Sequence, residues 1–314
     1  MEGAREIAPR ATVALVGTPR IASAQEADVR TGGVSAIALL VPSFAAVSRG
    51  DYAPESLGAL GRALGGSGGA ALLFGRTRPG VMVGLDAFVA ESNATRLEGA
   101  LGVGAGLAAA VPDGEVEEGG LLALRFLGGV SLSGTSASAV QALGPFARVT
   151  EVRRGYVERV GGQRALDWLR ESGRGAPEGS LLLAMIEGTS GSVIVRGVAG
   201  IEPTRGAIHV GEDVGIAERI AVGVALGPIP SDAVERACRR ASAGLRGGAP
   251  HAAILVDTVG RSSRAALADA ADFTRRFGEI PWVGIRAAAQ IVGGAERPRI
   301  AQHTATLSLV YSAS

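Results

Sequence analysis

The sequence predicts a mixed α/β protein made of two pseudo-repeated α/β units with mixed sheets, joined by a central strand-helix segment. Short apolar runs typical of strands alternate with amphipathic helical patterns along most of the chain. One order of elements occurs twice, with equal spacing. Apolar residues make up 47% of the 314 residues and aromatic residues only 4%, so Ala, Val, Leu and Ile must build the cores with the help of 48 glycines.

The individual elements follow from the hydrophobic periodicity. The expected strands are 12–17, 34–41, 70–74, 121–126, 180–186, 192–198, 219–226, 251–256 and 304–311. The expected helices are 54–64, 86–97, 163–171, 231–245 and 264–277. Ser231 precedes an acidic first turn and is expected to be a helix N-cap, and Gly278 predicts a helix end.

The repeat joins an apolar strand, a loop with Arg and Gly, a helix and a Gly-rich segment. Gly102 follows Ala71 by 31 residues, and Gly284 follows Ala253 by 31 residues. Two diverged copies are therefore expected at about 11–131 and 192–311.

The repeat suggests three segments. We expect a first domain over 11–145, a connecting segment over 146–190 and a second domain over 191–311. Trp168 in the connecting segment is expected to be a buried anchor, because an amphipathic helix face usually packs on a core. A ligand-stacking role for Trp168 is the less favoured alternative.

Charge and composition exclude several functions. The chain has 31 basic and 30 acidic residues, and all the basic ones are Arg. We therefore expect no nucleic acid partner, and the absence of Lys excludes Schiff-base chemistry and the phosphate-binding Lys of a P-loop. The single cysteine, Cys238, cannot form an intramolecular disulfide, which favours a cytoplasmic location.

No membrane insertion is expected either. The apolar run at 12–17 is too short for a secretory signal. The longest uncharged stretches, 31–48 and 126–147, are interrupted by Gly and Pro or are rich in Ser and Thr.

Several motifs are better explained as structure. The GGSGG run at 65–69 follows an expected helix and precedes a strand, the reverse of a nucleophile elbow. The GVGAG run at 102–106 lacks the third glycine of a dinucleotide fingerprint. Cys238 lies on an apolar helix face and is expected to be a core thiol. The widely spaced His209, His251 and His303 predict no metal site; they are the only histidines of the chain.

Three polar residues stand at positions where function is common. Arg261 follows the strand at 251–256 in a DTVGR turn, and α/β folds place ligand loops at the carboxyl ends of strands. Gln290 and His303 border the last two expected strands, which are otherwise apolar. Arg261 as a loop cap and His303 as a hydrogen-bonded strand-edge residue are equally open alternatives.

The same segments resemble a known family. HAAILVDTVGR, FGEIPWVGIRAAAQI and AQHTATLSLV resemble the C-terminal part of FIST proteins, a family of small-ligand sensory domains. AALLF, GVGAGLAAA, LGPFARVTEV and QRALDWL are similar to the middle of the family pattern, and SVIVRGVAGIEPTRGAIHVGEDV to its Val-Arg strand and following turn. Together they cover most of residues 11–311.

The chain departs from the family pattern at several positions. Thr258 stands where the family has Cys, Ala289 where it has Gly, and Gln290 where it has Glu. Ile285 and Arg286 replace two phenylalanines. The usual N-terminal portion of the family is also not recognised, so the chain resembles a divergent member.

The resemblance implies a small-ligand-binding sensory protein that signals through a separate partner protein. The implied ligand is an amino-acid-like or other small anionic metabolite, which Arg196 and Arg261 can pair with through a carboxylate. We expect the other ligand-binding residues to be Thr258, Gln290 and His303.

Three alternatives stay open. In a hydrolase, Thr258 would be the nucleophile and His303 the base, but Asp257 faces away from Thr258 and no other acid is placed to orient His303; we therefore assign no catalytic residues and expect no enzyme. A heme-based gas sensor, known within the family, is disfavoured because aromatic residues are few and His303 is the one well-placed axial ligand. A purely structural interaction protein needs no polar site.

Overall fold

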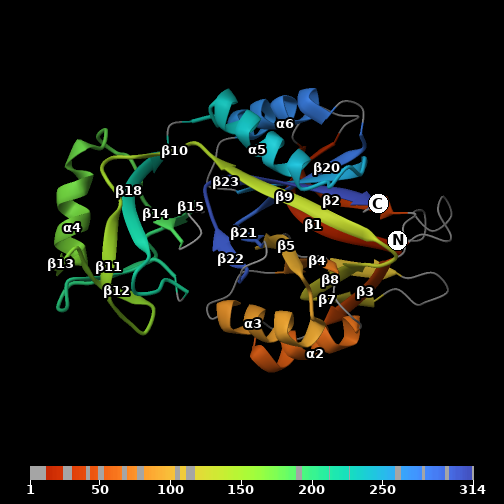
Figure 1. Cartoon of the computed structure of the whole chain (residues 1–314), viewed down its shortest axis with the longest axis horizontal. Coiled ribbons are helices and arrows are strands. Elements are labelled where there is room, and N and C mark those ends of the chain that lie inside the picture. Colours follow the sequence, from red (N-terminus) through yellow and green to blue (C-terminus); the bar gives the residue numbers. More distant parts are fainter. Residues whose placement is uncertain are drawn as a thin grey trace.

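The chain is mixed α/β, as predicted (Figure 1). The computed structural model describes residues 12–23, 30–39, 43–48, 53–65, 69–75, 81–102, 107–110, 117–188, 193–211, 213–225, 227–258, 263–277, 280–293 and 297–312. These residues form three sheets of eight, nine and six strands.

The eight-stranded sheet contains most of the C-terminal strands. Its order is β7 (Glu117–Gly119), β6 (Leu107–Ala110), β1 (Thr12–Ser23), β20 (Trp282–Ala287), β19 (Pro250–Thr258), β23 (Thr304–Ser312) and β9 (Val130–Ser138), with β2 (Arg30–Leu39) paired to β1. β19 and β20 are parallel, and their neighbours β23 and β1 run antiparallel to them. The sheet is therefore mixed.

The six-stranded sheet has the same character. Its order is β22 (Arg299–Ala301), β21 (Ala289–Val292), β5 (Arg96–Leu101), β4 (Ala70–Gly75), β8 (Leu121–Phe126) and β3 (Ser43–Ser48). β4 and β5 are its parallel pair. β21 directly follows β20 along the chain, so the chain crosses here from one sheet to the other.

These two sheets pack face to face between two layers of helices (Figure 1). Alternate apolar residues of both sheets, such as Leu72 and Ile254, share one buried cluster. The outer face of the six-stranded sheet packs on α2 (Pro54–Leu64) and α3 (Val81–Ser92). The outer face of the eight-stranded sheet packs on α5 (Ser231–Ala243) and α6 (Ser263–Phe277). We call this four-layer unit the sandwich.

The nine-stranded sheet forms a lobe beside the sandwich (Figure 1). Its order is β15 (Val193–Gly197), β14 (Leu182–Glu187), β18 (Arg219–Ala225), β11 (Ala147–Arg153), β12 (Tyr156–Val160), β17 (Ala207–His209) and β16 (Gly200–Glu202), with β10 (Val140–Ala142) on β18 and β13 (Gln163–Arg164) on β12. β15 and β16 lie at opposite ends of this order but are consecutive in the chain, so the sheet curls around its own core. Strands from all three segments expected from the sequence meet in this lobe.

The helix α4 (Ala165–Ser172), continued by the short η1 (Gly173–Gly175), covers the core of the lobe. Trp168 is buried there among apolar side chains, as an anchor does. Among the residues that the structure describes, no helix is long and apolar enough to cross a membrane.

Most helices lie where the sequence places them, with one shift. α2 has the predicted bounds, and α4, α5 and α6 differ from the prediction by one or two residues. α3 begins at Val81 and ends at Ser92, so the prediction of a helix to residue 97 is wrong. Asn93 has a φ of 51°, a left-handed conformation that ends the helix, and residues 96–101 form β5.

The two βαβ units share strand directions but not the predicted register. Ala71 pairs with Leu97, 26 residues later, whereas Ala253 pairs with Trp282, 29 residues later. Gly102 therefore follows β5, and the expected equivalence of Gly102 with Gly284, which lies inside β20, is wrong. The helices explain the shift: α3 has 12 residues and α6 has 15, whereas the connections on either side of the helix total eight residues in both units. Duplication of the chain stays a prediction.

Candidate functional site

The predicted residue Gln290 lies between the two sheets of the sandwich. Its neighbours Ala289 and Ile291 pack on the helix side of the six-stranded sheet, so Gln290 points to the eight-stranded sheet. Its side chain is fully buried. Buried amides require hydrogen-bond partners, and Gln290 takes these from the opposite sheet.

All four hydrogen-bonding positions of the Gln290 amide are used. Nε2 donates to the carbonyl oxygens of Val256 at 2.6 Å and Thr304 at 2.7 Å. Oε1 accepts from Thr304 Oγ1 at 2.9 Å and from Thr306 Oγ1. A carboxamide has two donors and two acceptor sites, so Gln290 joins β21 to β19 and β23 and has no capacity left.

Thr258 approaches the same Thr304 carbonyl oxygen that Gln290 binds, and His303 is the residue before Thr304. Thr258 is the last residue of β19, is buried, and directs its hydroxyl at the Thr304 carbonyl oxygen, 3.5 Å away. His303 directly precedes Thr304 and has a φ of 53°. Its own carbonyl oxygen accepts a hydrogen bond from Ser138 Oγ at 3.2 Å. Two of the five predicted residues, Thr258 and Gln290, therefore meet at the Thr304 carbonyl oxygen, and a third, His303, directly precedes Thr304 in the chain.

Two charged residues that sequence reasoning did not assign to the site lie next to Thr258. Asp257 on β19 and Arg286 on β20 are register partners, and both are buried. Arg286 Nε lies 3.4 Å from Asp257 Oδ2, and Nη2 donates to the Thr258 carbonyl oxygen at 3.1 Å. Both side chains alternate with residues of the inner cluster and so point towards the layer of α6.

This ion pair stands at the carboxyl ends of two adjacent parallel strands. That edge is where open α/β sheets place ligand-binding loops. The loop that follows β19 includes Arg261, which lies outside the described residues. A signal for the pair was present in the sequence, because Asp257 and Arg286 each interrupt an apolar strand.

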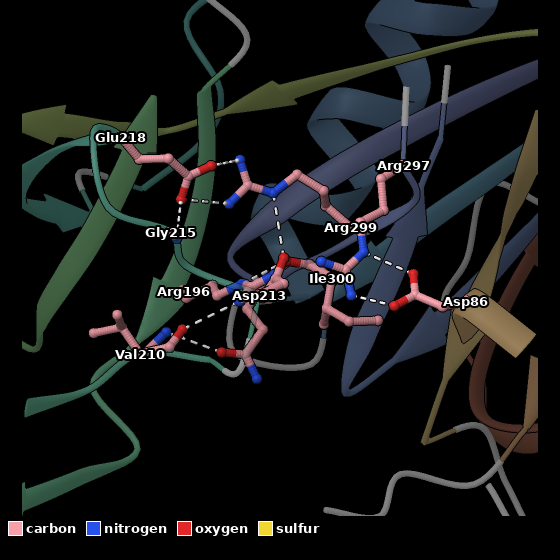
Figure 2. Close-up of polar contacts among 11 residues, drawn as sticks. Asp86, Arg196, Val210, Asp213, Gly215, Glu218, Arg297, Arg299 and Ile300 are labelled. Carbon is pink, nitrogen blue, oxygen red and sulfur yellow. Dashed lines mark hydrogen bonds and ion pairs between the residues drawn. The ribbon is translucent and has the colours of Figure 1, made fainter. Parts of the chain in front are cut away.

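Arg196 lies elsewhere, at the junction of the lobe and the sandwich (Figure 2). Its guanidinium forms a two-pronged ion pair with Asp213, in which Nη2 to Oδ2 is 2.8 Å. Nε donates to the Ile300 carbonyl oxygen at 2.7 Å, and Nη1 to that of Val210 at 3.3 Å. The arginine is thus engaged within the protein, and the structure does not bring it to the group around Thr304.

Arg299 and Glu218 extend this ion pair (Figure 2). Arg299 Nε lies 3.3 Å from Asp213 Oδ2, and its Nη1 lies 2.9 Å from Glu218 Oε1. Burial raises the pKa of Asp213, but the hydrogen bond from Arg196 and the charges of Arg196 and Arg299 outweigh burial, so the pKa lies below its usual 3.8. Asp213 is ionised at neutral pH.

A further buried carboxylate, that of Glu98, occupies the layer between the two sheets of the sandwich. Glu98 on β5 accepts hydrogen bonds from Ser308 on β23 and from Arg96. A Cβ on Gly134 of β9 would lie 1.9 Å from Glu98 Oε1, so the glycine is required for the carboxylate to fit. Sequence reasoning missed Glu98, although a lone acid within an apolar strand was a visible signal.

The remaining reactive groups have simple surroundings. Cys238 is buried on α5, and burial raises the pKa of its thiol to about 11. Among the residues that the structure describes, no group of three His, Cys, Asp or Glu side chains is arranged to hold a metal ion.

Comparison with known proteins does not assign the chain to a family. No protein-family model matches the chain, and no curated protein is significantly similar to it.

Proposed function

We propose that the chain binds a small amino-acid-like molecule at the carboxyl ends of β19 and β20 and signals its presence to a separate cytoplasmic partner protein. The observation that carries this proposal is the buried Asp257 and Arg286 pair at that edge. Removing two charges from water costs several kcal/mol, as a rough figure, and apolar residues of similar volume often replace such pairs without loss of stability. A pair placed at the ligand edge therefore suggests a use beyond folding.

The chemistry of the pair suggests the ligand class. A guanidinium binds a carboxylate through two parallel hydrogen bonds, and a carboxylate accepts from an ammonium group. An amino acid carries both groups on one carbon and can bridge Arg286 and Asp257. A ligand with a carboxylate alone would use only Arg286 of the two residues.

The other predicted residues take indirect roles in this proposal. The amide of Gln290 is filled by protein partners, so Gln290 positions Val256 and Thr304, whose carbonyl oxygen the Thr258 hydroxyl also approaches. Arg196 is engaged with Asp213 and is not proposed as a ligand contact. Thr258, Arg286 and Gln290 are three positions at which the chain departs from the FIST pattern. Their convergence supports a site specific to this chain.

A thermal-shift screen with amino acids, keto acids and nucleotides tests the proposal. A ligand present at 100 times its dissociation constant stabilises the folded state by about 2.7 kcal/mol. We expect amino acids to raise the melting temperature of the wild type, and Arg286→Lys, which keeps the charge but loses the two-pronged geometry, to reduce that rise.

Arg297→Gln is the matched control, because Arg297 pairs with Asp86 on the surface. It should keep the full ligand-induced rise. A screen without any stabilising amino acid would overturn the proposal, as would an equal rise in Arg286→Lys.

A further inference from the structure

The short strand β22 lies between the candidate site and the lobe. Gln290 on β21 pairs with Ala301 on β22, and Thr304 follows three residues later. Directly after β22, the backbone N–H of Gln302 donates to the Val195 carbonyl oxygen on β15 at 2.7 Å. One segment of chain therefore contacts the site group on one side and the lobe on the other.

The lobe holds this segment by side chains as well. Gly197 on β15 donates its amide to Gln302 Oε1 at 2.9 Å. Arg196 donates to the Ile300 carbonyl oxygen, and Arg299 reaches Asp213 and Glu218 in the lobe. Backbone and side-chain bonds thus fix residues 299–302 to the lobe.

The four charged groups of this junction form a buried neutral quartet (Figure 2). Arg196 and Arg299 balance Asp213 and Glu218, and no member of the quartet has a side chain more than 14% exposed. Separating buried opposite charges leaves each one uncompensated, which is costly. A displacement of Arg299 therefore carries the lobe with it more readily than it breaks the quartet.

Arg297 makes a contrasting contact just before the strand. It pairs with Asp86 of α3, within the sandwich, and both side chains are largely exposed, at 54% and 42%. Exposed pairs contribute about 0–1 kcal/mol. The charged attachment of this segment to the lobe is thus buried, whereas its attachment to the sandwich consists of the β21 ladder and one exposed ion pair.

We propose that β22 couples the candidate site to the lobe, so that a change in the hydrogen bonds of Gln290 and Thr304 shifts the packing of β15 through the Arg196, Asp213, Arg299 and Glu218 quartet. This inference rests on the proposed function for its ligand, but the coupling itself is measurable without one. In this proposal, the junction of lobe and sandwich is the element that both the site and the quartet bias.

Hydrogen exchange on the ligand-free protein tests the coupling. Gln290→Ala removes the amide that joins β21 to β23, and we expect β15 amides in the lobe to exchange about tenfold faster than in the wild type. In Arg299→Gln the quartet is broken, and adding Gln290→Ala to it should change β15 exchange little, because coupled residues are not additive. Arg297→Gln, the control, should leave the effect of Gln290→Ala intact.

The coupling would be refuted if Gln290→Ala altered exchange only in β19, β21 and β23. It would also be refuted if the effects of Gln290→Ala and Arg299→Gln on β15 simply added. Mutants that retain wild-type circular dichroism keep this comparison valid, and the conservative Gln290→Glu is a second variant at the site.

The two tryptophans allow a second test of the coupling, by fluorescence in the presence of a ligand. Trp168 lies in the lobe and Trp282 in the sandwich, and the chain has two in total. In Trp282→Phe, an amino acid that stabilises the protein should change Trp168 emission, and Arg299→Gln should remove that change while the dissociation constant stays within about threefold. Binding without a Trp168 response contradicts the coupling, whereas absence of any binding contradicts the proposed function and leaves hydrogen exchange to decide the coupling.

Discussion

The two βαβ units of the sandwich have the same strand directions but bury their charges on opposite faces. In β4-α3-β5, the register pair that corresponds to Asp257 and Arg286 is Gly75 and Leu101, and Leu101 lies in the cluster under α2 and α3. The buried charge of that unit, Glu98, faces the other sheet. In β19-α6-β20, the corresponding helix-facing positions carry Asp257 and Arg286.

This difference separates two uses of buried polarity. The first unit shows that uncharged residues, here Gly75 and Leu101, can close the carboxyl edge of such a pair of strands, so folding does not require charges there. Glu98 and Gln290 reach across the layer between the sheets and bond the hydroxyls of β23, which fixes one sheet against the other. The charges of the second unit do not join the sheets and are therefore the ones that we connect with a ligand.

Breaking the charge pair of the second unit should have the largest effect. Asp257→Asn leaves the buried guanidinium of Arg286 without its counter-charge, and we expect a loss of about 3–5 kcal/mol in the free energy of unfolding. The double variant Asp257→Leu with Arg286→Met gives this edge the apolar character of the first unit and should recover most of that loss. Urea denaturation of both variants measures the difference.

Asp86→Asn serves as the control, because it breaks the exposed pair with Arg297. It should cost less than about 1 kcal/mol. If Asp257→Asn were as mild as Asp86→Asn, the pair would not be desolvated and the contrast between the two units would be lost.

Gly134→Ala tests the fastening role of Glu98 and should have the next largest effect. The added Cβ would lie 1.9 Å from the Glu98 carboxylate, so the variant should lose about 1–3 kcal/mol by overpacking. In a Glu98→Ala background, the further cost of Gly134→Ala should be much smaller. Equal costs in both backgrounds would show that the carboxylate is not what fills the space beside Gly134.

Acid titration tests the buried ion pairs at the junction of the lobe and the sandwich. The folded-state pKa of Asp213 lies below 3.8, its usual value, so ionised Asp213 stabilises the fold above that pH and the contribution is lost as the pH falls through the folded-state pKa. We expect stability to fall below about pH 4. Asp213→Asn should flatten this dependence, and an unchanged acid slope of the unfolding free energy in that variant would contradict it.

The fold class could be predicted because hydrophobic periodicity is a local property. The helix α5 and the strand β19 followed directly from it, although the N-cap of α5 is Pro230 and not Ser231, which is the first helical residue. The end of α3 was missed because the apolar pattern continues past Asn93, where the backbone changes to a left-handed conformation. Spacing alone also misplaced Gly102 against Gly284, because α6 is three residues longer than α3 and this difference shifts the strand register.

The site could be predicted only in part, because local sequence patterns do not show the long-range partners of a residue. Gln290 and His303 were recognised because each borders an apolar strand, and Thr258 because it stands where the resembled family has Cys. Arg196 was expected to be available, but its partner Asp213 lies on a separate loop that sequence does not place beside it. Long-range partners decide whether a buried polar residue has capacity for a ligand.

The last and smallest expected effect concerns heme. It contrasts the polar group around Thr304, next to His303, with the apolar layers of both units. Side chains near Thr304, including Gln290, Thr258 and Thr306, are bonded to one another or to the backbone. Heme sites require a wide apolar cavity around the axial ligand. We therefore expect no sharp Soret band when hemin is titrated into the purified protein. A Soret band that persists in His251→Ala, an exposed histidine bonded to Ser312, but disappears in His303→Ala would contradict this prediction and identify His303 as an axial ligand.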